Sequence, residues 1–368
     1  MANGRRKWGW LASAAALLVL AAWLMFQGDP PLPEGPNRVA LPTWQRPDEV
    51  KRVDARRTVM VLPTVNDAGM VGPPPKPVDP VMKLMPTSVK HGAMVAEFNA
   101  IVNSDVGSLM LDCLFEGDER FLSELRDAGL DPATAIDRVA FIDDTVVVTG
   151  NFQSGAWKRL MPGNPTESDY GPHAKLYQWT LPDGGAEALG TWNGTMMLTG
   201  DSPQSVKAAI DRLDDQGPRE PGVLTDDQAY GEMDGVLGVD TLAQVIGQND
   251  EGLARTFREA AKNVRIHADV SHDVGLVADI DGSDATKTEE LRRSLGGALS
   301  LARMQAQAKG QNDQAQLFDA ARVREAGKGA FRLEAGLPYD FMKKVFGDCV
   351  QRKKHPPPVE AGEGDAGE

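Results

Sequence analysis

The sequence is poor in cysteine and in short catalytic motifs. It has 2 cysteines in 368 residues, too few for a disulfide scaffold, and neither has a Cys or His partner at the spacing of a zinc site. The strings G-x-S-x-G, Walker A, C-x-x-C and H-E-x-x-H do not occur, which argues against the common hydrolases and nucleotide-dependent enzymes. We therefore assign no catalytic, cofactor-binding or metal-binding residue and expect no cofactor, although a site built from distant residues stays open.

The two cysteines leave two interpretations open. Cys113 lies in the apolar run Leu109–Phe115, and Cys349 lies near the C-terminus. Outside the cytoplasm they could form one disulfide, whereas as half-buried free thiols they would act as small apolar side chains. The apolar surroundings of Cys113 favour free thiols.

Basic residues are outnumbered by acidic ones, 39 to 53, which gives a formal net charge of −14. Binding to a phosphate backbone depends on clustered Lys and Arg, so we expect no nucleic acid partner. Residues 1–57 hold nine Lys and Arg against five Asp and Glu, a net of +4, which leaves −18 for residues 58–368. An acidic body on a basic stem should stand away from an anionic membrane surface.

One long apolar run is present, from Trp8 to Phe26, and its one polar residue is Ser13. At about 1.5 Å per residue, a helix of this run reaches about 30 Å, the hydrocarbon thickness of a bilayer. A cleavable signal peptide is the alternative, because small residues occur at Ala21 and Ala22. The run continues past that site, so we predict that residues 1–28 form a cytoplasmic stub and an uncleaved transmembrane anchor.

Charge on the two sides of the run predicts its orientation. Arg5, Arg6 and Lys7 precede it, and no basic residue follows it before Arg38. The positive-inside rule then places the N-terminus in the cytoplasm. We expect a single-pass protein of the inner (cytoplasmic) membrane whose C-terminal region is extracytoplasmic.

Proline is concentrated after the predicted anchor, where 13 of the 25 prolines lie between Pro30 and Pro86. Such a segment favours polyproline II, so residues 29–88 are predicted to form a semi-rigid tether. Within it, Thr58–Leu62 is either a short docking strand or a locally sticky linker patch, and the second is favoured. The acidic, Gly-rich residues 355–368 are typical of a disordered tail.

Between tether and tail, the patterns predict two units, residues 89–216 and 217–354. In the first, two β-branched runs flank Asp143-Asp144, which predicts a hairpin. Ser202 as N-cap and Pro203 at the first helical position predict a helix that ends before Gly217. Other expected strands are 93–98, 176–180, 188–192 and 195–199, and other expected helices are 106–115 and 119–128.

The second unit repeats this kind of succession of strands, hairpins and helices. The expected strands are 236–239, 264–270, 274–280 and 330–335, and the expected helices are 252–262, 285–309 and 339–350. Hairpins dominate over β-α-β alternation, so the predicted fold class is α+β, with antiparallel sheets covered on one face by helices. In both units an apolar strand turns directly into a helix, at Leu198–Ser202 and at Ala278–Ser283, which suggests a diverged internal duplication.

Three groups of residues resemble chemical sites. Asp279, Asp281 and Asp284 resemble part of a calcium loop, but the glycine is misplaced, and a strand end followed by a helix cap is preferred. Asp143 and Asp144 could be paired carboxylates, but neighbours in a turn point apart, which favours turn chemistry. His267 and His272 lack metal-ligand spacing and are expected at surface or edge positions, and flexible core filling is expected of Met82, Met85, Met94, Met196 and Met197.

The run Asp127–Ala140, followed by Val146–Phe152, resembles a segment of uncharacterised membrane-anchored envelope proteins of myxobacterial and related bacteria. That group has no assigned activity, so the resemblance supplies no functional residues. It implies a location in the bacterial envelope.

The sequence favours non-catalytic binding or scaffolding in the bacterial envelope, with the membrane engaged through the N-terminal helix and an unknown envelope protein as partner. Two alternatives stay open. An envelope enzyme such as a hydrolase, with a non-contiguous active site, predicts a deep cleft with converging titratable groups. Small-ligand binding between the two units predicts a mostly apolar pocket near residues 214–236.

Overall fold

The computed structural model describes residues 39, 41–42, 46–56, 78–114, 123, 126–128, 130–131, 134–161, 165–181, 184–215, 220–225, 230–248 and 250–344. The predicted anchor, the tail, Cys349 and the stretch Thr58–Leu62 lie outside these residues, so the predictions for them stay predictions. No helix within the described ranges has both the length and the apolarity to cross a bilayer.

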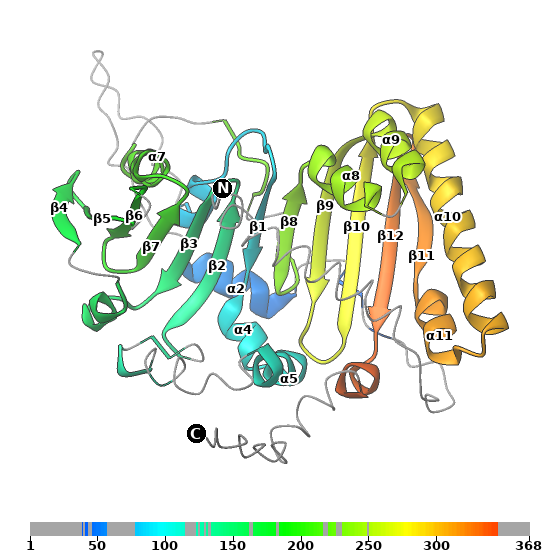
Figure 1. Ribbon diagram of the computed structural model, residues 1–368, viewed down its shortest axis with the longest axis horizontal. Coiled ribbons are helices and arrows are strands. Elements are labelled where there is room, and N and C mark those ends of the chain that lie inside the picture. Colours follow the sequence, from blue (N-terminus) through cyan, green and yellow to red (C-terminus); the bar gives the residue numbers. More distant parts are fainter. Residues whose placement is uncertain are drawn as a thin grey trace, which may run out of the picture.

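Twelve strands form one sheet, in the order β11-β12-β10-β9-β8-β1-β2-β3-β7-β6-β5-β4 (Figure 1). All neighbours are antiparallel, and β1 (Gly92–Ala96) pairs with β8 (Met233–Leu237) where the two predicted units meet. This confirms an α+β fold with a large antiparallel sheet. The remaining strands are β2 (Ile136–Ile142), β3 (Thr145–Gly150), β4 (Thr166–Tyr170), β5 (Ala174–Thr180), β6 (Ala186–Trp192), β7 (Met196–Gly200), β9 (Ala261–Asp269), β10 (Val274–Gly282), β11 (Arg322–Gly327) and β12 (Ala330–Leu337).

The strand order repeats on the two sides of the β1–β8 pair. Counted outward, one side runs β1-β2-β3-β7-β6 and the other runs β8-β9-β10-β12-β11, and β5 and β4 extend the first side. Each side also has two helices after its first strand, α4 (Phe98–Val102) and α5 (Asp105–Leu114), or α8 (Val239–Gly247) and α9 (Glu251–Ala260). The two turns predicted to correspond do not, because Gly200 ends a fourth-position strand and Gly282 ends a third-position strand.

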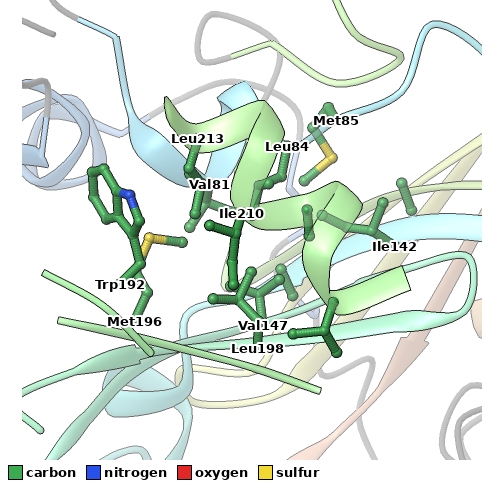
Figure 2. Packing of buried hydrophobic residues seen from close by; sticks show 14 of the residues in the cluster. Val81, Leu84, Met85, Ile142, Val147, Trp192, Met196, Leu198, Ile210 and Leu213 are labelled. Carbon is green, nitrogen blue, oxygen red and sulfur yellow. The ribbon is translucent and has the colours of Figure 1, made fainter. Parts of the chain in front are cut away.

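Helix α7 (Pro203–Asp214) covers the first side of the sheet, as its local signals predict. Ser202 caps it, with its side chain accepting from the Ser205 N–H. Val206 and Ile210 are fully buried, and in Figure 2 Ile210 lies over Val147 and Leu198 of the sheet. Full burial of such a side chain stabilises the fold by about 1.5–3 kcal/mol. Burial therefore fixes where this helix lies.

Two parts of the predicted tether are folded, which corrects its extent. Helix α3 (Pro80–Lys83) is capped by Asp79, and Val81, Leu84 and Met85 are buried in the same core as α7 (Figure 2). Helix α2 (Pro47–Arg56) lies within the tether as well. The folded body thus includes residues on the N-terminal side of residue 89, because apolar side chains in this proline-rich stretch find a core to enter.

The helices do not all cover one face, so that part of the predicted architecture is wrong. Because alternate residues of a strand point to opposite faces, Val236 of β8 faces the core under α7. Its neighbour Leu237 pairs with Val264, which belongs to a separate core under α8, α9 and α10 (Ala285–Ala308). The second side of the sheet is therefore apolar on the face opposite to that of the first side. The other helices are η1 (Ala156–Leu160) and α11 (Asn312–Ala320).

Helix α10 forms where the sequence predicts a helix, over 285–309, and its side chains are buried unevenly along its length. Leu291 is fully buried and Leu295 packs against the same core, whereas Ala298 is exposed. Further along, Leu301 and Met304 are 52% and 57% exposed. The C-terminal half of α10 runs alongside the edge strand β11 (Figure 1).

Candidate functional site

Charged side chains line the second side of the sheet on the face away from α8, α9 and α10. Directly opposite residues of an antiparallel pair share a face, and the register links Asp234 on β8 to His267 on β9 and Asp279 on β10 to Arg332 on β12. We call this surface the polar face. It comprises Asp234, Arg265, His267, Asp279, Arg332 and Glu334.

The deepest pair on the polar face joins Asp234 and His267. Asp234 Oδ1 lies 2.7 Å from His267 Nδ1, and both side chains are almost fully buried. Neither atom has an aligned hydrogen-bond partner. The Tyr230 ring stacks on the imidazole, with 3.6 Å between the ring centroids. Burial raises the pKa of Asp234, against the opposing effect of His267. The prediction of a surface or edge position for His267 is therefore wrong, because its neighbours in the sheet cover it.

Toward the β11 edge of the sheet, the ion pairs of the polar face are more exposed. Arg332 Nε and Nη2 donate to the two carboxylate oxygens of Asp279 at 2.7 and 2.8 Å, and this hydrogen bonding raises the pKa of Arg332. Arg324 Nε lies 3.0 Å from Glu334 Oε2. The two-point pairing of Arg332 with Asp279 fixes both of these side chains in orientation. The charges of the polar face thus bind one another across neighbouring strands.

Helix α2 lies against this face and is held by an arginine at its start. Arg46 Nη2 donates to Glu232, and Arg46 Nη1 lies 3.2 Å from Asp269 Oδ2. Glu49 accepts from the backbone N–H groups of Arg46 at 2.6 Å and of Gly231 at 3.1 Å. We call Glu232, Asp269 and the Gly231 N–H the acidic cradle. It binds a helical segment that is far from it in the sequence.

The acidic cradle holds more negative than positive charge. Glu232 and Glu49 are 3% and 4% exposed, and with Asp269 they place three carboxylates around Arg46. Burial and the neighbouring Asp269 raise the pKa of Glu232. Burial alone would raise the pKa of Asp269 as well, but hydrogen bonds from Ser271 and the charge of Arg46 lower it. Burial lowers the pKa of Arg46 and the three carboxylates raise it, with a net increase. The guanidinium is thus the cation that balances this buried acid.

A cavity of about 30 Å³ lies between α2, α3 and the sheet. Arg138 and Asp79 form its wall on the side of the first unit, where Arg138 Nη1 and Nη2 donate to the two Asp79 oxygens at 2.6 and 2.9 Å. Tyr230, Glu232 and Asp234 line it from the second unit. A mostly apolar ligand pocket near residues 214–236 is one of the alternatives that the sequence leaves open, and seven of the twelve residues that line this cavity are charged. The volume suits a single water molecule rather than an organic ligand.

The predicted acidic sites have structural roles. Asp143 Oδ1 accepts from three backbone N–H groups, those of Lys90, His91 and Gly92, at 2.9, 2.8 and 3.2 Å. Asp143 also has φ 45°, as a tight hairpin turn requires. The preference for turn chemistry is confirmed.

The three aspartates of the calcium-like segment separate in the structure. Asp279 binds Arg332 on the polar face, and Asp284 caps α10 by accepting from the N–H groups of Thr286 and Lys287. Asp281 is exposed at the end of β10. The preferred interpretation, a strand end followed by a helix cap, is confirmed. In the part of the chain that the structure describes, no three His, Cys, Asp or Glu side chains are placed to hold a metal ion.

The remaining candidates from the sequence are His272, the two cysteines and the methionines. His272 is exposed, as expected, and lies 3.0 Å from Asp105. Cys113 lies in the last turn of α5, and its pairing with Cys349 cannot be compared with the structure because Cys349 lies outside the described ranges. Core filling is confirmed for Met85 and Met196, which are buried, and for Met82 and Met197, which pack against the cores.

Sequence reasoning missed the acidic cradle. Its members lie at positions 231, 232 and 269, the residues that they bind lie at positions 46 and 49, and none of them forms a local motif. The one available signal is Asp234, a charge within the otherwise apolar strand β8, because His267 lies in the polar register of the alternating strand β9. That signal marks a buried polar pair without naming its partner.

Comparison with known proteins does not assign this chain to a family. No family model and no curated protein matches the chain. Among solved structures, it is similar to one titled "Structure of crystal form I of TP0453", with 8% sequence identity and a TM-score of 0.34, over 73% of this chain and 96% of that chain. A likeness at so low a TM-score carries no argument about function.

Proposed function

We propose that this chain is a membrane-anchored, extracytoplasmic protein of the bacterial envelope that works by non-catalytic binding or scaffolding, with another envelope protein as its partner. The observation that carries the proposal is the acidic cradle, in which buried carboxylates hold the arginine of a separate helix. Groups placed for catalysis converge on a space open to a substrate. Here Arg46 fills that place, and the adjoining cavity of about 30 Å³ admits only water.

The single-pass anchor is predicted from the sequence alone. The position of α2 affects the length of chain that links this anchor to the folded body. With α2 docked, the stretch between the predicted anchor and Val39, which lies against Gly336 of β12, is residues 29–38 and can span at most about 35 Å when extended. With α2 and the buried Pro42 both released, the stretch up to residue 77 could reach at most about 170 Å. Docking of α2 therefore sets how far the body stands from the membrane, as a scaffold requires.

The repeated strand order supports the second, finer part of the proposal, that the body consists of two similar units. The order outward from β1 matches the order outward from β8 through five strands. We infer a diverged internal duplication in which β4 and β5 in one unit occupy the chain position of α10 and α11 in the other. Two joined units would offer a partner two related surfaces.

The test uses the full-length protein in its own membrane. Protease added to spheroplasts should digest the body, and native electrophoresis of solubilised membranes should show the chain in a complex larger than itself. A truncation after residue 88, which keeps the predicted anchor and tether, should abolish that complex. Recovery of the complete chain in the soluble fraction, or a body shielded from the protease, would contradict the location. A complex that survives the truncation unchanged would refute the binding role.

A further inference from the structure

A groove of about 460 Å³ lies at the β11 edge of the sheet, between α10, α11 and β11. We call it the edge groove. It is separate from the acidic cradle, since none of the residues that line it also lines the cavity beneath α2. Its volume falls in the range of small-molecule sites, which is roughly 300–1,000 Å³. The size alone therefore permits an organic ligand.

The edge groove is basic in an acidic protein. Arg303, Arg322 and Arg324 line it, and Asp319 is the one acidic lining residue, a net of +2 against −14 for the chain. Glu334, which pairs with Arg324, lowers this to +1 when it is counted. A local field of this sign attracts anions that the rest of the surface repels.

One of the three guanidinium groups is available. Arg303 Nε lies 2.8 Å from Asp319 Oδ1, and Arg324 is bound to Glu334. Arg322 is exposed, and no carboxylate in the described part of the chain lies within ion-pair distance of it. A guanidinium presents a planar fork of donors that matches carboxylate and phosphate oxygens. Arg322 can thus bind an incoming anion without first breaking an ion pair.

The uncharged residues that line the groove are apolar, apart from Ser300. Leu299, Phe318 and Val323 are half-buried side chains that border the same space. Gly296 borders it too, and a Cβ at Gly296 would meet nothing within 4 Å. Glycine inside a helix weakens that helix, and packing within this chain does not require it here. The missing side chain leaves the groove open.

We propose that the edge groove binds an amphiphilic anion, a carboxylate or phosphate joined to an apolar group. The acidic head binds Arg322, with Arg303 and Arg324 beside it, and the apolar group packs on Leu299, Phe318 and Val323. The anion comes either from a lipid headgroup or from a free amphiphile. This site is independent of the proposed scaffolding role.

The chain offers a matched pair of variants for the test. Gly296→Leu fills the groove, whereas Gly297→Leu makes the same change at the next residue, which does not line the groove and also has nothing within 4 Å of a Cβ. Both replace a helical glycine, so both should leave the melting temperature unchanged or higher. Arg322→Glu on β11 reverses the available charge, and Lys309→Glu makes the same charge change at the C-cap of α10, outside the groove.

The measurement is calorimetric titration of the full-length chain in phosphatidylcholine nanodiscs with hexyl phosphate, and with hexanol as the neutral probe. We expect hexyl phosphate to bind and hexanol not to, and Gly296→Leu and Arg322→Glu each to weaken binding about tenfold or more. Gly297→Leu and Lys309→Glu should bind like the unchanged chain. Equal binding of hexanol, or equal affinity of Gly296→Leu and the unchanged chain, would overturn the proposal.

A second arm identifies the source of the anion. If a lipid headgroup occupies the groove, phosphatidylglycerol in the nanodiscs should weaken hexyl phosphate binding to the unchanged chain. If the natural ligand is a free amphiphile, the two kinds of nanodisc should give the same affinity. Either result supports an anion site, whereas no detectable hexyl phosphate binding in phosphatidylcholine nanodiscs refutes it.

Discussion

Replacing Arg46 with alanine should release α2 from the sheet while the rest of the fold stays intact. The substitution removes the cation that binds Glu232 and Asp269. It leaves Glu232 and Glu49, which are 3% and 4% exposed, with no guanidinium to balance them. Removing one partner of a buried ion pair typically costs about 3–5 kcal/mol. Because the Arg46 side chain is 33% exposed, we expect roughly 2–4 kcal/mol for opening of α2.

Amide hydrogen exchange measures this opening directly. Each 1.4 kcal/mol is a factor of about ten, so amides of α2 should exchange roughly 30 to 700 times faster in Arg46→Ala. The Gly231 N–H should follow, because its acceptor Glu49 leaves with the helix. Amides of α7 should keep their protection, since no residue of α7 lines the cavity beneath α2.

The matched control is Lys51→Ala, which removes the same charge from an exposed position of the same helix. It should change exchange in α2 by no more than about twofold. The reasoning is refuted if Arg46→Ala leaves the protection of α2 unchanged, or if Lys51→Ala reduces it equally. Loss of protection in α7 as well would show that the cradle supports the whole body rather than one helix.

Three further outcomes test other parts of the structure. Burial and Asp269 raise the pKa of Glu232 above its ordinary value of 4.5, so Glu232 stabilises the fold fully at low pH and loses this contribution as the pH rises through the raised pKa. Glu232→Gln should therefore flatten the fall of the urea unfolding midpoint with pH over that window. An unchanged slope would contradict this assignment. Asp143→Ala removes the acceptor of three backbone N–H groups and should lower the unfolding free energy by about 1–3 kcal/mol, whereas Asp144→Ala should cost less. Ile210→Ala empties a fully buried position under α7 and should cost about 2–5 kcal/mol, and the exposed Leu301→Ala should cost far less in the same denaturation assay.

Elements with complete local signals were predicted well. Helix α7 has its cap at Ser202 and a proline in its first turn, and it forms where predicted. The β2–β3 hairpin also forms where predicted, because two β-branched runs flank Asp143, which has the φ of 45° that a tight turn requires. These signals operate over a few residues, so the rest of the fold does not need to be known.

Elements that depend on a partner rather than on a pattern of their own were missed. Strand β11 is almost entirely exposed and lacks an apolar alternation, and it is a strand because β12 pairs with it. Helix α2 lies in a proline-rich stretch and is held by Glu232 and Asp269, which are far away in the sequence. Pairing of this kind leaves no periodic pattern in β11 or α2 themselves.

The sequence by itself determined the α+β class, the capped helix α7 and the local turns, because caps and alternation act within one turn or one strand. Only the tertiary structure decided that the units share one sheet through β1 and β8, and that their helices cover opposite faces. It also decided that His267 is buried and that Arg46 binds an acidic cradle. The physical reason is that cross-strand pairing and desolvation depend on which residues, far apart in the sequence, come into contact. Burial of side chains over the whole sheet determines which of these contacts form.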